Sequence, residues 1–384
     1  MPKRPIIQDI SVISDLTPSS QGEAFNPGAP ASQNPMTPIE RHDMLVRLEK
    51  SISDLMIDSE KTYQNNCYKP GTTEVDLDYI CRLSTNEFFF FTREPLTLKE
   101  FEALQNKLVD EAKKRPSGLQ LILGSFAVKT ESGKVMNVVP HITCGQLPNF
   151  NFIVKSYTSP VDFRYQIPDG KGNTSLLEAL DVTNPDNPMP SITVNGATVD
   201  LSFNNIVTCK TPGEASFLTA VDICLDHAKG VAKQNFEALS ARHPETSKKP
   251  ISHVVVSNWV DLISTQCLGS FVMHADPCCS PKRCKAGIAQ KAVFRGKLAF
   301  GNNYFTRYEL EKSAILTKED ELKIQENKYI LINELKRIPN SNWQNILLAL
   351  PEVLGVLNET YPLPSYDSQG NQVYFTIAEQ VIFS

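Results

Sequence analysis

Hydrophobic residues in the first part of the chain follow two patterns, one typical of strands and one typical of helices. Residues 6–13 form a short, largely apolar run that favours a strand. Leu45, Leu48, Ile52 and Leu55 then recur at helical spacing, so one face of a helix should lie on a sheet.

Two predicted helices begin with the same signature. Thr37 and Thr97 can each cap a helix, and a glutamate, Glu40 or Glu100, follows each of them three residues later. In such a capping box, the two side chains accept hydrogen bonds from N–H groups that the first helical turn leaves without partners. The strand-like residues 76–91 lie between the two helices, and an alternation of strands and helices is typical of an α/β fold.

From residue 119 the composition is that of strands. Residues 119–128 and 134–143 are separated by a polar turn, which predicts a hairpin. Another hairpin is predicted around Asn195-Gly196, because this dipeptide between alternating segments is the strongest short signal for a two-residue turn.

Length and composition favour one large domain with additions. The chain has 384 residues, of which 41% are hydrophobic, and this is sufficient for a substantial core. We assign residues 1–300 to this domain, with a loop insert at 17–36 and a hairpin insert at 169–215. Residues 301–384 are a C-terminal extension with one predicted helix at 318–335. The formal net charge of −5 gives a nucleic-acid partner no electrostatic support.

Cysteine usage and the lack of long apolar runs indicate a reducing compartment. No run approaches the roughly 20 apolar residues that span a membrane, and no apolar segment follows the basic residues within 1–5. The nine cysteines are therefore expected to be reduced. We expect a cytoplasmic protein without a membrane partner. Secretion by a signal-independent route and assembly into a homo-oligomer stay open.

One cysteine is placed where a nucleophile would be useful. Cys224 follows the apolar run 220–223 and precedes a polar stretch that includes Gly230. Backbone N–H groups after the strand, and the positive end of a following helix, favour a thiolate and can hold an oxyanion. A buried structural cysteine is the more common role for this residue type, so the interpretation depends on partners.

Two other strand-like runs end in a single charge. Glu87 precedes four consecutive phenylalanines, and this apolar setting should raise the pKa of the carboxyl group toward neutrality, as suits a general base. Lys155 follows the run 152–154 and can contact the oxygen of a tetrahedral intermediate. Solvated strand-end charges are the alternative interpretation of both residues.

The order of these segments, Asn86-Glu87-Phe88, then Ile153-Val154-Lys155, then Asp222-Ile223-Cys224-Leu225, resembles the nitrilase, or carbon–nitrogen hydrolase, superfamily. The resemblance extends from about residue 5 to residue 300, and only the cysteine segment is individually specific. It implies an α/β fold with a four-layer α-β-β-α sandwich.

The resemblance also implies a mechanism. Glu87 takes the proton of Cys224, the thiolate attacks an amide carbonyl, and Lys155 together with the Leu225 N–H group stabilises the oxyanion. Water then hydrolyses the thioester, and no metal or organic cofactor is needed.

Three features of the sequence leave questions for the structure. The family often adds a second glutamate, for which this chain offers Asp162, one methylene shorter, or alternatively Glu214. The insert 169–215 joins the segments that carry Lys155 and Cys224, so we expect its hairpin near the mouth of the site; a surface hairpin without a role at the site is the alternative, since loops tolerate insertions. Residues 274–284 contain one histidine and three cysteines but lack the paired spacing of a zinc knuckle, so we expect no metal there.

We therefore expect a cysteine-dependent hydrolase of non-peptide carbon–nitrogen bonds, an amidase acting on a small-molecule amide or on a protein amide. An acyltransferase, in which an amine resolves the thioester, has the same triad. A nitrilase and a catalytically inactive binding scaffold are the remaining alternatives.

Overall fold

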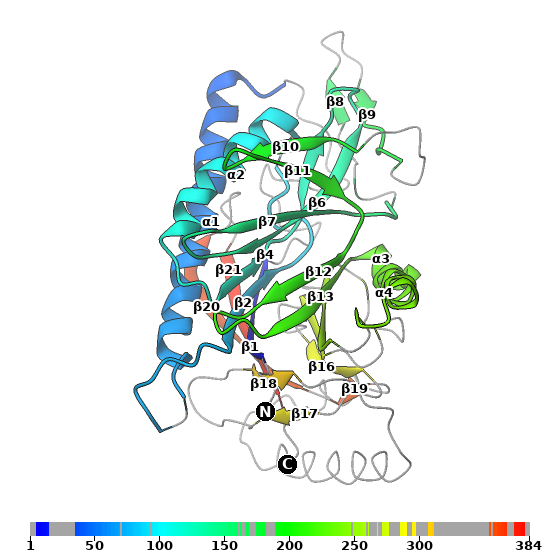
Figure 1. Ribbon diagram of the computed structural model, residues 1–384. Coiled ribbons are helices and arrows are strands. Elements are labelled where there is room, and N and C mark those ends of the chain that lie inside the picture. The colour runs from blue at the N-terminus through cyan, green and yellow to red at the C-terminus, as the bar shows by residue number, and fades with distance from the viewer. Residues whose placement is uncertain are drawn as a thin grey trace.

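The computed structural model describes most of the first 260 residues and several strands beyond them. The described residues are 5–14, 35–69, 71–92, 94–159, 162, 166–168, 174–181, 189–246, 249–258, 260, 267, 271–275, 285–289, 294–296, 306–310, 353–354, 356–366 and 372–380. They form a mixed α/β fold with two large sheets (Figure 1).

The larger sheet has 13 strands, and its main order is β10-β11-β7-β6-β4-β2-β1-β18-β17. Its centre is parallel, because β1 (Ile6–Ser14) pairs with β2 (Tyr79–Thr85) and β2 pairs with β4 (Leu119–Ile122) in the same direction. The other strands of this sheet are β3 (Leu96–Thr97), β5 (Phe126–Lys129), β6 (Val135–Thr143), β7 (Asn149–Val154), β10 (Ser191–Val194), β11 (Ala197–Ser202), β17 (Phe294–Gly296), β18 (Thr306–Leu310), β20 (Val356–Tyr366) and β21 (Gln372–Gln380).

The smaller sheet has six strands in the order β12-β13-β14-β15-β16-β19. Their bounds are β12 (Ile206–Lys210), β13 (Ser216–Ile223), β14 (Ile251–Val256), β15 (Phe271–Ala275), β16 (Lys285–Ala289) and β19 (Val353–Leu354). Strands β13, β14 and β15 are parallel neighbours. A separate pair of short strands, β8 (Gln166–Pro168) and β9 (Thr174–Leu176), forms an antiparallel hairpin.

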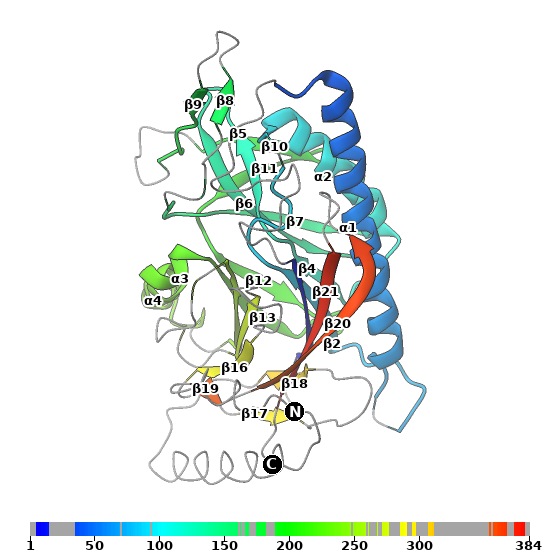
Figure 2. The same ribbon diagram turned by 180° about the vertical axis from the view of Figure 1, so that it is seen from behind.

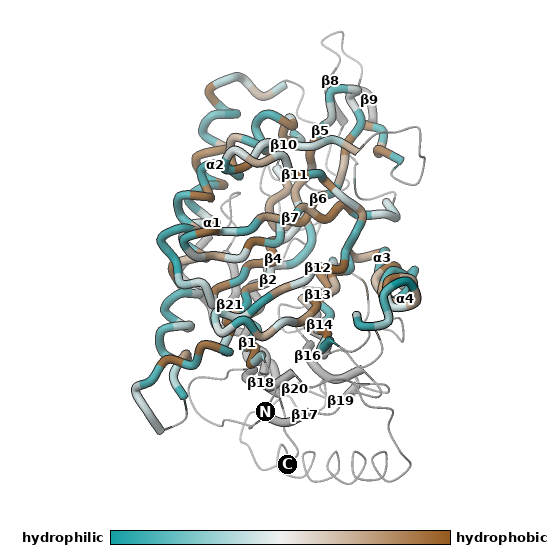
Figure 3. The backbone as a smooth tube through the Cα atoms, viewed as in Figure 1, coloured by the Kyte–Doolittle hydropathy of each residue, from teal (hydrophilic) through white to brown (hydrophobic). Residues whose placement is uncertain are grey.

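Two long helices lie beside the larger sheet, as the view from behind shows for α1 (Figure 2). Helices α1 (Pro38–Asn66) and α2 (Leu98–Lys113) both begin with a complete capping box, so this prediction is confirmed. Helices α3 (Leu225–Lys229) and α4 (Val231–Arg242) follow β13 directly. Along α1, hydrophobic and hydrophilic residues alternate, as expected for a helix with one buried face (Figure 3).

Apolar clusters show which surfaces pack together. One cluster joins the inner faces of α1 and α2 to the larger sheet. A second contains Ile80 and Ile122 of the larger sheet with Val221 and Val254 of the smaller sheet, so the two sheets face one another. A third joins the other face of the smaller sheet to α4, through residues such as Ala232.

A buried ion pair crosses the interface between the sheets. The guanidinium of Arg82 on β2 donates to both carboxylate oxygens of Asp9 on β1, at 2.6 and 2.9 Å. It also donates to Ser252 Oγ on β14, at 2.6 Å, and to Thr219 Oγ1 on β13, at 3.4 Å. All four residues are buried, and this polar group therefore fixes the position of one sheet on the other.

The predicted hairpin around Asn195-Gly196 is present, but the expectation that it reaches the mouth of the site is wrong. Strand β11 runs parallel to β7, with Leu201 opposite Phe152. The turn therefore lies beside the start of β7, at the end of that strand farthest from Lys155. There Asn195 Oδ1 accepts a hydrogen bond from Lys113, the last residue of α2, at 3.2 Å.

The C-terminal extension contributes strands to the larger sheet. Both β18 and β21 pair with β1 in antiparallel directions. A domain limit near residue 300 stays a prediction. The helix expected at 318–335 lies outside the described residues, as do most of the loop insert at 17–36 and residues 276–284 of the cysteine-containing segment.

No helix within the described ranges combines the length and the apolar character that a membrane crossing requires.

We predict that Arg82 and Asp9 each stabilise the fold mainly by neutralising the buried charge of the other. Asp9→Leu alone removes the carboxylate that binds the buried guanidinium at two nitrogens, and should lower the free energy of unfolding by about 3–5 kcal/mol. Adding Arg82→Met removes the buried positive charge as well and should restore most of the loss. Urea unfolding of the single and double variants measures both effects, and a double variant less stable than Asp9→Leu would contradict the prediction.

Candidate active site

Strand ends bring the candidate residues together. Glu87 follows β2, Lys155 directly follows β7, and Cys224 directly follows β13. Strand β7 runs in the same direction as β2, because the two antiparallel steps through β6 restore the direction of the parallel strand β4. Glu87 and Lys155 therefore lie at the same edge of the larger sheet, and the facing smaller sheet supplies Cys224.

Lys155 forms the centre of a buried charged cluster. Its Nζ lies 2.8 Å from Glu87 Oε1 and 2.7 and 2.9 Å from the two carboxylate oxygens of Asp162. All three side chains are buried. The two carboxylates raise the pKa of Lys155 against the opposing effect of burial, so the ammonium stays charged.

The second acidic residue of this cluster, which takes the fourth position beside Glu87, Lys155 and Cys224, is Asp162 and not Glu214. A tight turn presents the Asp162 carboxylate, because it accepts hydrogen bonds from Ser159 N–H at 2.8 Å and from Ser159 Oγ at 2.9 Å. Glu214 lies in the exposed turn before β13, where it pairs with Lys210 at 2.5 Å. The whole of β13 separates that turn from Cys224, so Glu214 is too far from the cluster, and its alternative assignment is wrong.

Asn137 is a member of the site that sequence reasoning missed. Its Nδ2 donates to Glu87 Oε1 at 3.0 Å, and its backbone oxygen accepts from Lys155 N–H at 2.9 Å. A second support comes from Ser125, whose Oγ accepts from Phe88 N–H at 3.0 Å. The available signal for Asn137 was a polar residue inside the otherwise apolar start of β6.

Cys224 has an unusual backbone conformation. Its φ is 50° and its ψ is −105°, a region that costs a non-glycine residue on the order of 1–3 kcal/mol. Its N–H donates to Val256 O at 2.9 Å, and its thiol donates to Asn258 O, with Sγ 3.6 Å from that oxygen. The sharp turn thus directs the chain from β13 into α3 while β14 holds the cysteine from the side.

The expected shift of the Glu87 pKa is confirmed. Burial, opposed by Lys155 and supported by Asp162, raises the pKa of Glu87 to about 7. The Oε1 atom is bound by Lys155 and Asn137, whereas Oε2 has no hydrogen-bond partner among the described residues. A carboxylate with one free oxygen and a pKa near neutrality can accept a proton.

The expectation that the surroundings of Cys224 favour the thiolate over the thiol is wrong. Burial, and then the charge of Glu87, raise the pKa of the Cys224 thiol well above its ordinary value, and Lys155 opposes this only in part. Helix α3, with five residues, is also too short for a strong dipole. The resting pair is therefore a neutral thiol beside a titrating carboxyl group.

Asp226 joins the lysine segment to the cysteine segment. Its carboxylate accepts from Ser156 N–H at 2.9 Å and from Tyr157 N–H at 2.7 Å. Burial raises its pKa to about 8. Leu225, between Cys224 and Asp226, is the first residue of α3, and the first N–H groups of a helix have no acceptor within that helix.

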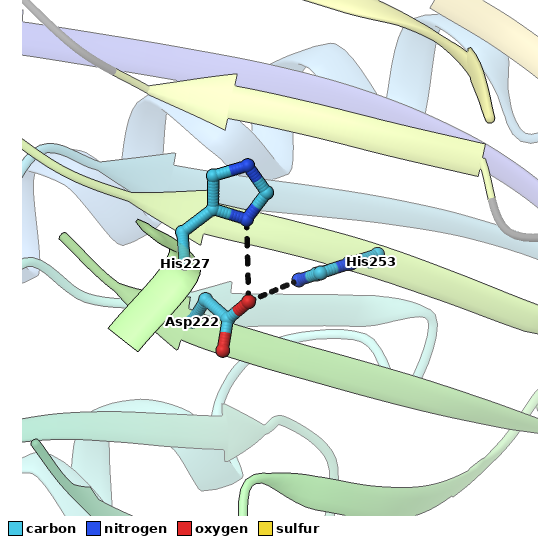
Figure 4. A group of neighbouring side chains, drawn as sticks. All are labelled: Asp222, His227 and His253. Atoms are coloured by element: carbon cyan, nitrogen blue, oxygen red, sulfur yellow. Dashed lines mark hydrogen bonds and ion pairs between the residues drawn. The ribbon is translucent and has the colours of Figure 1, made fainter. Parts of the chain in front are cut away.

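One group in the described part of the chain has the composition of a metal site. Asp222, His227 and His253 offer ligand atoms within 4.8 Å of one another, and all three side chains are buried (Figure 4). The group lies behind Cys224, on the face of the smaller sheet that packs against α4.

Comparisons with known proteins give only distant similarity. No family model and no curated protein matches the sequence. Among solved structures, an N-terminal amidase matches with a TM-score of 0.30 and 10% identity over 67% of this chain and 49% of that chain. An N-terminal amidase with a Gln-Val peptide matches with a TM-score of 0.28 and 9% identity over 67% of this chain and 49% of that chain. A carbon–nitrogen hydrolase from Helicobacter pylori matches with a TM-score of 0.35 and 8% identity over 90% of this chain and 99% of that chain.

The chain thus spans about half the length of the N-terminal amidases that it matches. Similarity at this level assigns neither an activity nor the role of any residue.

We predict that the reactivity of Cys224 depends on pH through Glu87. Because the pKa of Glu87 is raised to about 7, its proton-accepting form is lost as the pH falls through that value. The rate of alkylation of Cys224 by iodoacetamide should therefore fall about tenfold between pH 8 and pH 6, with the midpoint near 7. Peptide mapping by mass spectrometry measures the rate at this single thiol.

Glu87→Gln should abolish the change in alkylation rate that is centred near pH 7. The alkylation rate of Cys224 should then stay low and rise only at alkaline pH. Glu214→Gln is the matched control, because it removes an exposed carboxylate and should leave the pH profile unchanged. An unchanged profile in Glu87→Gln would contradict the assignment of Glu87 as the proton acceptor.

Proposed function

We propose that this protein is a cysteine-dependent hydrolase of non-peptide carbon–nitrogen bonds, an amidase that acts through Glu87, Lys155 and Cys224. The single observation that carries the proposal is the buried lysine, bound to Glu87 and Asp162 at the edge where Asp226 joins the cysteine turn to the lysine segment. The proposal includes the four-layer α-β-β-α order and a cytoplasmic location, where a reactive thiol stays reduced.

The first step is a proton transfer coupled to attack. The Cys224 thiol proton moves to the Glu87 carboxylate while sulfur forms a bond to the amide carbonyl carbon. Total charge is conserved in this step, because Glu87 becomes neutral as the substrate oxygen becomes negative. A raised pKa on both groups is compatible with this order, since neither a free thiolate nor a permanently ionised Glu87 is required.

Lys155 and the Leu225 N–H group are proposed to stabilise the tetrahedral oxyanion. A preorganised cation in a buried site stabilises developing negative charge more strongly than it would in water. Glu87 then returns its proton to the leaving nitrogen as the carbon–nitrogen bond breaks, which leaves a thioester on Cys224. Water, deprotonated by Glu87, hydrolyses this thioester and releases the acid.

The experiment that tests the proposal is incubation with a panel of amides of different size, followed by mass spectrometry of the protein and of the products. An acyl adduct on Cys224, together with release of ammonia or amine and of a carboxylic acid, supports the hydrolase. Release of a new amide when a second amine is present instead identifies an acyltransferase.

Cys224→Ala should abolish turnover and the adduct while it leaves the thermal unfolding temperature nearly unchanged, because only a small side chain is lost. Cys144→Ala is the matched control. Cys144 is also a buried free cysteine, but it directly follows β6 at the end of that strand farther from Asn137. Turnover that survives Cys224→Ala would overturn the proposal.

A separate prediction concerns the acid beside Lys155. Asp162→Asn removes one of two negative charges that hold the ammonium, and should lower kcat/KM by roughly 10–100-fold, because a misplacement of about 1 Å in a site can cost up to about 10²-fold. Glu214→Gln should have no effect on kcat/KM. Equal losses in both variants would show that Asp162 acts only through general electrostatics.

A further inference from the structure

We propose that Asp222, His227 and His253 form a metal-free hydrogen-bonded clamp that positions Cys224 from behind, with His227 Nδ1 and His253 Nε2 each donating to the Asp222 carboxylate. This inference deepens the proposed function, because it assigns positioning residues to the same nucleophile. The hydrogen-bonded arrangement itself does not depend on that function.

Asp222 accepts hydrogen bonds from four different structural elements. Its Oδ2 contacts His227 Nδ1 on α3 at 3.3 Å and His253 Nε2 on β14 at 3.0 Å, and both imidazoles meet at this one oxygen (Figure 4). Its Oδ1 accepts from Ala232 N–H at the start of α4, at 3.0 Å, and from Asn205 Nδ2 before β12, at 3.2 Å. A carboxylate accepts about four hydrogen bonds, so Asp222 is saturated.

The hydrogen bonds determine which nitrogen of each imidazole carries the proton. His253 Nδ1 accepts from Cys267 N–H at 3.2 Å, so the proton of a neutral His253 is on Nε2, which donates to Asp222. His227 can bind the carboxylate only as a donor, so its Nδ1 carries a proton. Although burial opposes ionisation, the hydrogen bonds from both histidines lower the pKa of Asp222, which keeps the acceptor charged.

The same bonds argue against a metal ion at this group. A metal would need the lone pair of His253 Nε2, and the proton would then have to move to Nδ1. Nδ1 already accepts a hydrogen bond from Cys267 N–H, so a proton there would face another N–H group. Two histidines and a carboxylate are a common ligand set for transition metals, but this donor pattern is complete without one.

Two residues of the clamp flank Cys224 in the sequence. Asp222 stands two residues before Cys224 and His227 three residues after it, so their contact closes a short loop across the cysteine. A second bond, from His227 N–H to Cys224 O at 2.9 Å, reinforces this loop. The positive φ of Cys224 is an unfavourable conformation that surrounding contacts must maintain, and the clamp supplies contacts on both sides.

Paired substitutions separate hydrogen bonding from packing. Asn in place of His227 keeps an N–H donor at the position of Nδ1, and Gln in place of His253 keeps one at the position of Nε2. His227→Leu and His253→Leu fill similar space without a donor. Each variant is tested for the alkylation rate of Cys224 by iodoacetamide, at a temperature well below its unfolding transition.

We expect His227→Asn and His253→Gln to keep the alkylation rate within about threefold of the wild-type protein, and the two leucine variants to lose about tenfold or more. Ile251→Val, in the apolar cluster beside the clamp, is the control for a general loss of stability and should leave the rate unchanged. Equal rates in the donor-keeping and leucine variants would overturn the clamp.

Nitrogen-15 NMR of the wild-type protein provides a second test that requires neither a variant nor a substrate. His227 Nδ1 and His253 Nε2 should each carry a proton, and added Co²⁺ should produce no visible ligand-field absorption that is lost in His253→Gln. Other tautomers, or a cobalt spectrum lost in His253→Gln, would overturn the clamp. If the tautomers are as expected but no amide is turned over, the proposed function fails while the clamp stands.

Discussion

The ammonium group of Lys155, held between two carboxylates away from water, is the constraint on which the site depends. A buried charge is costly unless it is paired and hydrogen-bonded, and here one cation meets Glu87 and Asp162 within 2.7–2.9 Å. Because the three groups come from separate segments, their attraction fixes the end of β2, the end of β7 and the turn at Asp162 relative to one another. Burial, with the charge of Asp162 added to it, raises the pKa of Glu87 to about 7 despite the opposing charge of Lys155.

The smaller sheet must also hold Cys224 in a fixed position relative to this charged cluster. Polar contacts between the sheets, centred on Arg82 and Asp9, and the apolar cluster around Val221 and Val254 set how β13 lies against β2. At the end of β13, Asp226 joins the cysteine turn to the segment after Lys155. The strained conformation of Cys224 is therefore held by the lysine segment, through Asp226, and from the side by β14, through Val256 O.

Much of the fold could be predicted from local signals. The capping boxes at Thr37 and Thr97 located two helices, because helix caps depend on residues only three positions apart. Glu87, Lys155 and Cys224 could be selected because each ends an apolar strand. Pairings between distant segments had no such local signal: Asp222 and His253 are 31 residues apart, and the direction of the β10–β11 hairpin depends on which strand β11 joins. The pKa of Cys224 was misjudged because burial and the facing Glu87 arise only in the folded chain.

Asp162 shows how a turn can replace side-chain length. An aspartate is one methylene shorter than a glutamate, so from the same backbone position its carboxylate would end short of Lys155. In this chain the turn from Ser159 folds back, with Asp162 N–H donating to Ser159 O at 3.1 Å while the carboxylate accepts from Ser159 N–H and Oγ. This turn brings the backbone toward the ammonium and also occupies the carboxylate oxygens with donors. Asp162 thus binds Lys155 with both of its carboxylate oxygens, whereas Glu87 binds it with Oε1 alone and has a pKa raised to about 7, so Glu87 is the acid that can exchange a proton.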